Sequence, residues 1–250
     1  MSPRDWDAGS YERVSAPLEA MGREVLDRLD LRGDERVLDA GCGTGRVTAA
    51  LVERLPRGEV VAVDGSRAMV EAARERLGDT VELHVADLLE LELHRPVDAI
   101  LSTATFHWIA DHERLFARLR DLLVPGGRLV AQCGGAGNIS ALKDAAERVG
   151  EREPFAAALA GWPGPWNFAG TAETAERLTR LGWTDVRAWY QHVRVEPDDP
   201  HEYIGTVALG SHLARLEPEQ RGPFIEAVLA ELDEPVVDYT RLNILARRPS

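Results

Sequence analysis

The stretch "VLDAGCGTGRVTAAL", residues 37–51, places an apolar run directly before three glycines at alternate positions, Gly41, Gly43 and Gly45. Apolar residues at four-residue spacing follow the glycines, and this spacing is typical of a helix. A glycine-rich turn between a strand and a helix lets a ligand approach the backbone where a Cβ atom would keep it away. The stretch therefore predicts a ligand site at the end of a buried strand.

The residues around this turn narrow the class of ligand. A dinucleotide fingerprint, G-x-G-x-x-G, would require a glycine where this chain has Arg46. Asp39 adds a negative charge two residues before Gly41, and a carboxylate attracts an ammonium group but not a pyrophosphate. The turn therefore favours a zwitterionic or cationic ligand and leaves a nicotinamide-dependent oxidoreductase as the weaker alternative.

Two further acids close the next apolar segments. Asp64 ends the predicted strand 59–65, and an acid at that place can accept hydrogen bonds from both hydroxyls of a ribose. Asp87 ends the predicted strand 81–87 and is suited to accept a hydrogen bond from the exocyclic amine of an adenine. A single aspartate at a strand end is often only a helix N-cap. Three of them with the glycines indicate S-adenosylmethionine, which carries an ammonium, a ribose and an adenine.

Strand and helix periodicities alternate along the chain and predict parallel βαβ units, whose ligands lie at the carboxyl ends of the strands. The predicted strands are 36–41, 59–65, 81–87, 97–103, 127–133, 184–195 and 239–247; helices are predicted at 16–30, 47–55, 66–77, 112–123, 200–216 and 218–232. The segment "AGWPGPWNFAG", 160–170, interrupts the helical pattern and is interpreted as a loop or lid.

In combination, four segments resemble the class I S-adenosylmethionine-dependent methyltransferases. They are "VLDAGCGTG" (37–45), "VAVDGSRAM" (61–69), "VADLLEL" (85–91) and "LLVPGGRLV" (122–130). The resemblance implies an α/β, Rossmann-like, seven-stranded and mostly parallel sheet with helices on both faces and an antiparallel last strand. The cofactor-binding residues it implies are Tyr11, Asp39, Gly41, Gly43, Asp64, Gly65, Met69, Asp87, Leu88 and Thr103.

On the acceptor side, "STATFHWIADHERLF" (102–116) and "WDAGSYERVSAP" (6–17) resemble the trans-aconitate methyltransferase-like group. The resemblance implies that His107 and Trp108 are catalytic and that they line the acceptor pocket with Trp6 and Tyr11. It also implies a helical cap over the pocket. The Asn-Pro-Pro-Tyr type of tetrapeptide, with which nucleic-acid and glutamine amide methyltransferases hold an amino group, is absent from 102–116.

The expected reaction is methyl transfer to a small organic acceptor, most readily on oxygen, with a carboxylate first and a hydroxyl second. An S-adenosylmethionine-binding enzyme of another reaction type, such as cyclisation or rearrangement, is the main alternative. A carboxylate is ionised at neutral pH and needs no general base. A hydroxyl acceptor would make His107 the candidate base, because histidine titrates near neutral pH.

Several side chains keep two interpretations at this point. His107 is either a proton acceptor or a packed wall residue, and Trp108 is either a hydrogen-bond donor to the acceptor or an apolar plug. The aromatic residues of the 160–170 segment either line the pocket or, as slightly favoured, anchor the loop. A polycarboxylate acceptor would require converging arginines, and the candidates are Arg152, Arg187, Arg194 and Arg215.

Length and composition bear on domain organisation, partners and localisation. The chain is predicted to form one methyltransferase domain over 1–250, with a cofactor-binding half over 1–135 and lid and cap segments over 136–183 and 197–236. A net charge of −13 and the absence of a basic run argue against nucleic acid as a partner. No apolar run is long enough to span a membrane, so a cytoplasmic protein is expected. The two cysteines and seven histidines show no spacing for a disulfide framework or a metal site, and the sequence does not indicate an oligomeric state.

Overall fold

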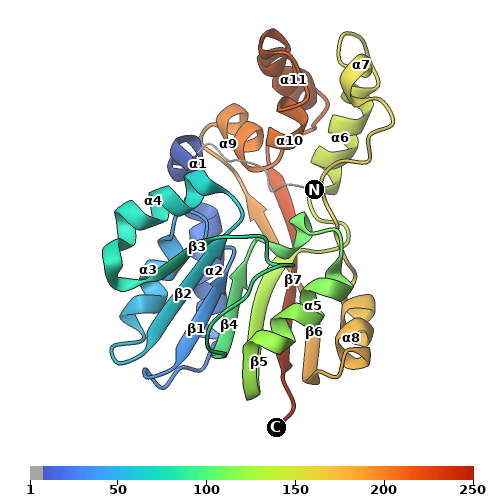
Figure 1. Ribbon diagram of the computed structural model, residues 1–250. Coiled ribbons are helices and arrows are strands. Elements are labelled where there is room, and N and C mark those ends of the chain that lie inside the picture. Colours follow the sequence, from blue (N-terminus) through green and yellow to red (C-terminus); the bar gives the residue numbers. More distant parts are fainter. Residues whose placement is uncertain (1–7) are drawn as a thin grey trace.

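A computed structural model describes residues 8–250, so the predicted acceptor residue Trp6 lies outside the described part of the chain. Seven strands form one sheet in the order β3-β2-β1-β4-β5-β7-β6 (Figure 1). The strands are β1 (Arg36–Ala40), β2 (Glu59–Asp64), β3 (Glu82–Val85), β4 (Val97–Thr103), β5 (Leu123–Gly134), β6 (Thr184–Val195) and β7 (Val237–Arg247). β7 is antiparallel to both β5 and β6, whereas the other pairs are parallel. The predicted Rossmann-like sheet with an antiparallel last strand is confirmed.

Helices cover both faces of the sheet and form a cap at one end of it (Figure 1). The helices are α1 (Ala8–Val14), α2 (Ala16–Asp27), α3 (Arg46–Glu53), α4 (Arg67–Leu77), α5 (His112–Leu122), α6 (Ser140–Gly150), α7 (Ala156–Leu159), α8 (Thr171–Arg180), α9 (Pro200–Val207), α10 (Gly210–Leu213) and α11 (Pro218–Ala230), with short 3₁₀ turns η1 (Gly78–Thr80) and η2 (Phe106–Trp108). The helix predicted at 200–216 is divided into α9 and α10. Gly205 and Gly210 lie around the break, and glycine disfavours a continuous helix.

The apolar strands explain the layered core. Every residue of β1 is buried, because helices pack against both faces of the central parallel strands. Side chains of α2, α3 and α4 fill one face, including Leu26, Leu51 and Leu77. Side chains of α5 and α8 fill the other face, including Phe116 and Leu178. Although α8 falls within the predicted lid segment 136–183, it packs against β6 as part of this sheet layer.

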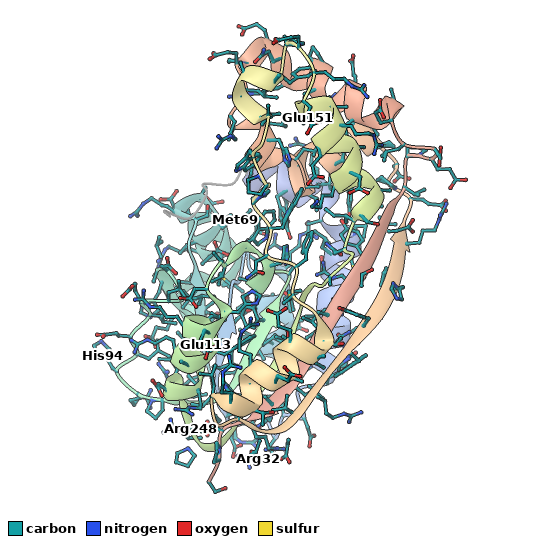
Figure 2. The ribbon with its side chains drawn as sticks, turned by 90° about the vertical axis from the view of Figure 1, so that its right-hand side faces the viewer. Arg32, Met69, His94, Glu113, Glu151 and Arg248 are labelled. Carbon is teal, nitrogen blue, oxygen red and sulfur yellow. The ribbon has the colours of Figure 1, made fainter. Side chains whose placement is uncertain are left out.

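The cap has an apolar core of its own. Phe155, Tyr203 and Phe224 are buried there, with further apolar side chains from α6, α9 and α11. The cap lies beyond the carboxyl ends of the parallel strands (Figure 1). Figure 2 shows Glu151 on the cap, Arg32 and Arg248 at the opposite end of the molecule, and Met69 between them. Within residues 8–250, no helix is long and apolar enough to cross a membrane.

Candidate active site

The glycine turn after β1 needs its glycines for two different reasons. Gly41, at φ +92°, packs so closely against Thr105 that a Cβ atom would lie 2.0 Å from the Thr105 Oγ1 atom. Gly43, at φ +54°, would meet no atom within 4 Å, and its N–H donates a 3.0 Å hydrogen bond to Asp64 Oδ2. Gly41 thus lets the segment after β4 approach the turn, whereas Gly43 leaves bare backbone beside open space.

Asp39 is the buried carboxylate of this site. Its Oδ2 atom accepts a 2.7 Å hydrogen bond from Thr48 Oγ1, and its Oδ1 atom has no hydrogen-bond partner within residues 8–250. Burial raises the pKa of Asp39 to about 6, and the nearby Asp64 carboxylate also raises it. A buried carboxylate oxygen without a partner is costly unless a ligand supplies a donor. The ammonium of a bound methionine group fits this requirement.

The other two acids lie at the same edge of the sheet. The Oδ1 and Oδ2 atoms of Asp64 accept hydrogen bonds from the backbone N–H groups of Ser66, at 2.9 Å, and Gly43. Asp87 accepts one from Leu89 N–H, also at 2.9 Å. Carboxylate oxygens carry enough lone pairs to accept further bonds from a ribose or an adenine. The structure therefore brings together the acids that the sequence placed at successive strand ends.

The other predicted cofactor residues surround these acids. Gly65 is half-buried directly after Asp64, and Met69 is buried in the first turn of α4. Leu88 is buried next to Asp87, and Thr103 is half-buried at the end of β4. Met69 and Leu88 are both apolar and almost fully buried.

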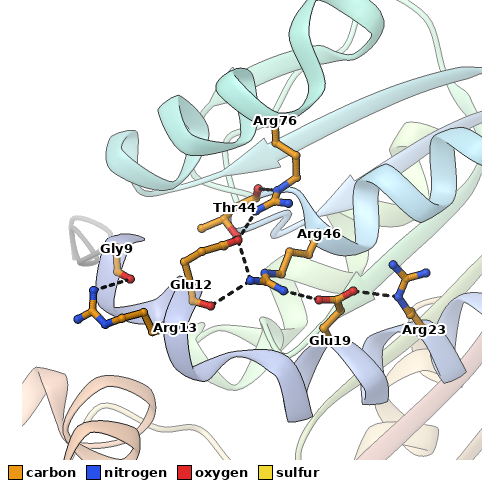
Figure 3. Close-up of polar contacts among 8 residues, drawn as sticks. All are labelled: Gly9, Glu12, Arg13, Glu19, Arg23, Thr44, Arg46 and Arg76. Carbon is orange, nitrogen blue, oxygen red and sulfur yellow. Dashed lines mark hydrogen bonds and ion pairs between the residues drawn. The ribbon is translucent and has the colours of Figure 1, made fainter.

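Helix α1 is tied to the glycine turn by a network of charges (Figure 3). Glu12 accepts a 3.0 Å hydrogen bond from Thr44 Oγ1 and pairs with Arg46, at 2.7 Å, and with Arg76. Arg46 also pairs with Glu19 of α2 at 2.6 Å. Arg46 thus takes the place of the third dinucleotide glycine and clamps α1 and α2 over the turn. The sequence analysis treated Arg46 only as evidence against a dinucleotide and missed this role.

Tyr11 extends from the same helix toward the interior. It is half-buried, and desolvation is the main cause that raises its pKa to about 12. The charges of Arg241, which lowers this pKa, and Asp64, which raises it, both act on Tyr11. Tyr11 therefore lies within electrostatic reach of both the cofactor acids and the acceptor side.

His107 and Trp108 lie in η2, after a turn in which Ala104 has a left-handed φ of 56°. His107 is buried, and its Nδ1 atom is 3.1 Å from the backbone nitrogen of Gly134. Because a backbone N–H can only donate, Nδ1 is the acceptor, and the neutral ring carries its proton on Nε2. Burial, and next the charge of Arg241, hold the pKa of His107 well below its usual range. His107 is therefore a neutral hydrogen-bond donor.

Aromatic rings continue from His107 into the cap. The His107 ring centroid is 4.9 Å from that of Trp108 and 5.8 Å from that of Phe168, and Phe168 stacks on Trp166 at 5.6 Å. The backbone N–H of Asn167 donates to the His107 carbonyl at 2.8 Å, which anchors the 160–170 segment. Trp162, Trp166 and His212 also line a cavity of about 240 Å³ in the cap. The segment is therefore anchored beside His107, and two of its tryptophans line this cap cavity.

The four arginines proposed from the sequence do not converge on a site. All are exposed: Arg152 pairs with Glu231, Arg194 pairs with Glu196 and Glu234, Arg187 lies over Trp189, and Arg215 lies over Trp162. The buried arginine on this side is Arg241, which the sequence analysis missed. Its signal was an arginine in the interior of the predicted strand "YTRLNILAR" (239–247), directly before a mostly apolar run.

Among the described residues, no group of three or more His, Cys, Asp and Glu side chains is placed to hold a metal ion. Cys42 and Cys133 are both buried and unpaired with each other. Burial raises the pKa of Cys133 to about 12, so its thiol stays protonated.

Comparison with known proteins identifies the family of the chain. Residues 37–127 match the family model described as a methyltransferase domain. A trans-aconitate 2-methyltransferase of Methylobacterium nodulans is 32% identical over 98% of each chain. One of Azoarcus sp. is also 32% identical, over 91% of this chain and 89% of its own.

Solved structures share the fold. The phosphoethanolamine N-methyltransferase 2 of Haemonchus contortus, solved with S-adenosyl-L-methionine, has a TM-score of 0.65 at 19% identity. The match covers 97% of this chain and 57% of that one. The [4+2]-cyclase SpnF has a TM-score of 0.61 at 21% identity, over 92% of this chain and 81% of its own. The fold therefore does not by itself determine the reaction.

The fold, the acids around the glycine turn and the sequence matches together define an S-adenosylmethionine-dependent methyltransferase of class I. Because relatives above 30% identity align over nearly the whole chain, the protein belongs to the trans-aconitate 2-methyltransferase family.

Proposed function

We propose that this enzyme methylates a carboxylate oxygen of a small organic acid. The observation that carries the proposal is the neutral Nε2–H tautomer of His107, fixed by the Gly134 N–H. A donor of this kind suits one oxygen of a carboxylate and leaves the other oxygen with its lone pairs. The names of the relatives, which are trans-aconitate 2-methyltransferases, support the same chemistry.

In this mechanism the protein mainly supplies geometry. When bound, S-adenosylmethionine provides a methyl group already activated by the sulfonium. Asp39 would hold its ammonium and Asp64 its ribose, while His107 donates to the carboxylate and directs the free oxygen at the methyl carbon. The new C–O bond forms as the C–S bond breaks, giving a methyl ester and S-adenosylhomocysteine. Trp108 and Phe168 would exclude water.

A hydroxyl acceptor fits these residues less well. Its proton must go to a base as the methyl group transfers. The Nδ1 lone pair of His107 is occupied by the Gly134 N–H, and Nε2 already carries a proton. The tautomer therefore supports a carboxylate acceptor over a hydroxyl acceptor.

The test is turnover with S-adenosylmethionine across a panel of small acids, phenols and amines, trans-aconitate among them. We expect acids to release S-adenosylhomocysteine and an equal amount of an alkali-labile methyl ester, identified by mass spectrometry. We also expect kcat to be flat between about pH 6 and pH 9, because no residue must lose a proton. Turnover confined to phenols or amines, or a kcat that rises with a pKa near 7, would contradict the proposal. A rearranged product without S-adenosylhomocysteine would favour the cyclase alternative.

A further inference from the structure

Arg241 is a buried cation at the acceptor side of the sheet. Its side chain and backbone are 3% exposed, and it faces Gly134 of β5 in the strand register. Gly134 is also the residue whose N–H holds the His107 ring. Arg241 therefore comes from β7, the last strand in the sequence, but lies close to His107, the residue proposed to bind the acceptor.

The surroundings of Arg241 do not neutralise it. Within residues 8–250, no carboxylate oxygen lies within 4.0 Å of its guanidinium. Its Nε atom donates to Gln132 Oε1 at 3.3 Å, and its Cζ atom lies 5.4 Å from the ring centroid of Tyr239. A buried charge without an opposite charge is costly, and a bound anion removes that cost.

Two tyrosines beside Arg241 supply a further donor. The hydroxyl oxygens of Tyr203 and Tyr239 are 2.8 Å apart and share one hydrogen bond. Burial raises the pKa of both phenols, so both stay protonated. Two hydroxyl groups that share one hydrogen bond keep one O–H available for another acceptor. The cation and this O–H together match the oxygens of a carboxylate.

We propose that Arg241, with Tyr203 and Tyr239, binds a carboxylate of the acceptor that is not itself methylated. The enzyme then selects acids with two or more carboxylates over monocarboxylates. This inference rests on the proposed carboxylate O-methylation and adds to it a residue that determines specificity.

The bound carboxylate is not the one that reacts. A guanidinium donates to both oxygens of a carboxylate at once and neutralises its charge. Such an oxygen is a poor nucleophile for the methyl carbon. The single donor of His107, by contrast, leaves one oxygen free. In this arrangement Arg241 holds one carboxylate of the acceptor, and His107 holds the carboxylate that is methylated.

The bound carboxylate is also not that of the cofactor. In methionine, the ammonium and the carboxylate are attached to the same carbon, and Asp39 of β1 would hold the ammonium. β4 and β5 lie between β1 and β7, so three strand spacings, about 14 Å, separate the backbones of these strands. The Arg241 guanidinium lies over Tyr239 of its own strand, and its Nε atom donates to Gln132 of the adjacent strand β5, still two strand spacings from β1.

The test compares Arg241→Gln, Arg241→Lys and the wild type on trans-aconitate, glutaconate and crotonate, which carry three, two and one carboxylates. We expect Arg241→Gln to lower kcat/KM about 30-fold or more for the first two acids, mainly through KM, and less than about threefold for crotonate. The affinity for S-adenosylmethionine stays within about twofold. Arg241→Lys keeps the charge without the bidentate geometry and gives an intermediate loss with the same selectivity.

Arg28→Gln is the matched control. Arg28 is half-buried rather than fully buried. It lies over Trp189 of β6, and its Nη2 atom donates to Gln191 Oε1 of the same strand at 3.0 Å. Its loss should leave the selectivity among the three acids unchanged. An equal loss on all three acids in the Arg241 variants, or a loss of S-adenosylmethionine affinity instead, overturns the inference. If Arg241→Gln does not fold, the selectivity of Arg241→Lys decides.

Calorimetry separates this inference from the proposed function. Binding of trans-aconitate in the presence of S-adenosylhomocysteine requires no methyl transfer. If no acid is methylated, the proposed function fails, yet Arg241-dependent binding of trans-aconitate would still support the carboxylate site. If acids are methylated but trans-aconitate binds the wild type and both Arg241 variants equally, the inference fails and the proposed function stands.

Discussion

The two sides of the candidate site are built in different ways. On the cofactor side, Asp39, Asp64 and Asp87 each lie within or next to the strand that places them, and all come from the first ninety residues of the chain. On the acceptor side, His107 follows β4, whereas Arg241 reaches the same region from β7, more than a hundred residues later. The candidate cofactor residues are thus placed by short stretches of sequence, whereas the proposed acceptor residues are brought together by long-range strand pairing.

The electrostatics of the two sides also differ in sign. The cofactor side buries carboxylates, of which Asp39 leaves one oxygen without a partner. The acceptor side buries an arginine with no carboxylate beside it among residues 8–250. A cofactor that carries an ammonium would compensate the buried carboxylate, and an acceptor that carries several carboxylates would compensate the buried arginine. This difference makes variants on the two sides separable by experiment.

The largest expected effect is on the cofactor side, in Asp39→Asn. The asparagine still accepts from Thr48 but has no charge to attract the ammonium. We expect S-adenosylmethionine to bind about 100-fold more weakly in calorimetry, within the range for truncating one side of a buried charge pair. The KM for the acid acceptor, measured at saturating cofactor, should change little. Unchanged cofactor affinity would show that Asp39 does not bind the ammonium.

The same variant should stabilise the protein without cofactor. Since burial raises the pKa of Asp39 to about 6, the folded state holds this proton more tightly than the unfolded state. Protonated Asp39 is accommodated below about pH 4. As the pH rises through about 6, ionisation of this buried carboxyl lowers the free energy of unfolding of the wild type by roughly 3 kcal/mol. Urea unfolding of both proteins at each pH measures the difference. A difference that does not grow between pH 4 and pH 6 would contradict this account.

The next effect distinguishes a donor from a base at His107. In His107→Gln, the amide oxygen can accept from Gly134 N–H while its NH₂ group donates to the carboxylate. We expect kcat within about fivefold of the wild type for this variant and about 30-fold lower for His107→Leu, which has no donor. Equal, large losses in both variants would instead identify a base. Single-turnover methyl transfer at saturating cofactor is the measurement.

Much of the cofactor side could be predicted from the sequence, because a turn glycine and a strand-end acid act over a few residues. The parallel strands followed from the same patterns, and the terminal pair β6 and β7 from the family resemblance. Arg241 could not be found in this way. Its importance depends on pairing with Gly134 and on two tyrosines from β7 and α9, which no local pattern brings together. The donor state of His107 likewise depends on a backbone N–H from β5.

A smaller effect is expected where α1 meets the glycine turn. Arg46→Ala removes two ion pairs, to Glu12 and to Glu19, that are partly shielded from solvent. We expect S-adenosylmethionine to dissociate about five to ten times faster, because such pairs contribute about 1 kcal/mol or less each. Arg23→Ala, which removes a more exposed pair with Glu19, is the control and should leave the rate unchanged. Stopped-flow displacement gives both rates, and equal rates in the two variants would exclude a clamp.

The smallest effect is expected for Arg215 in the cap, and it tests whether the cap cavity or the buried site at Arg241 binds the acceptor. Arg215 is exposed, lies 4.7 Å from the Trp162 ring centroid and donates to the Ala158 carbonyl at 3.2 Å. Because water and its aromatic neighbour already accommodate its charge, we expect Arg215→Ala to change the KM for trans-aconitate by less than about twofold. A tenfold rise in this KM would place a substrate carboxylate at the cap cavity beside Trp162. The contrast between Arg215, as an exposed structural residue of the cap, and Arg241, as a buried substrate-binding residue, would then fail.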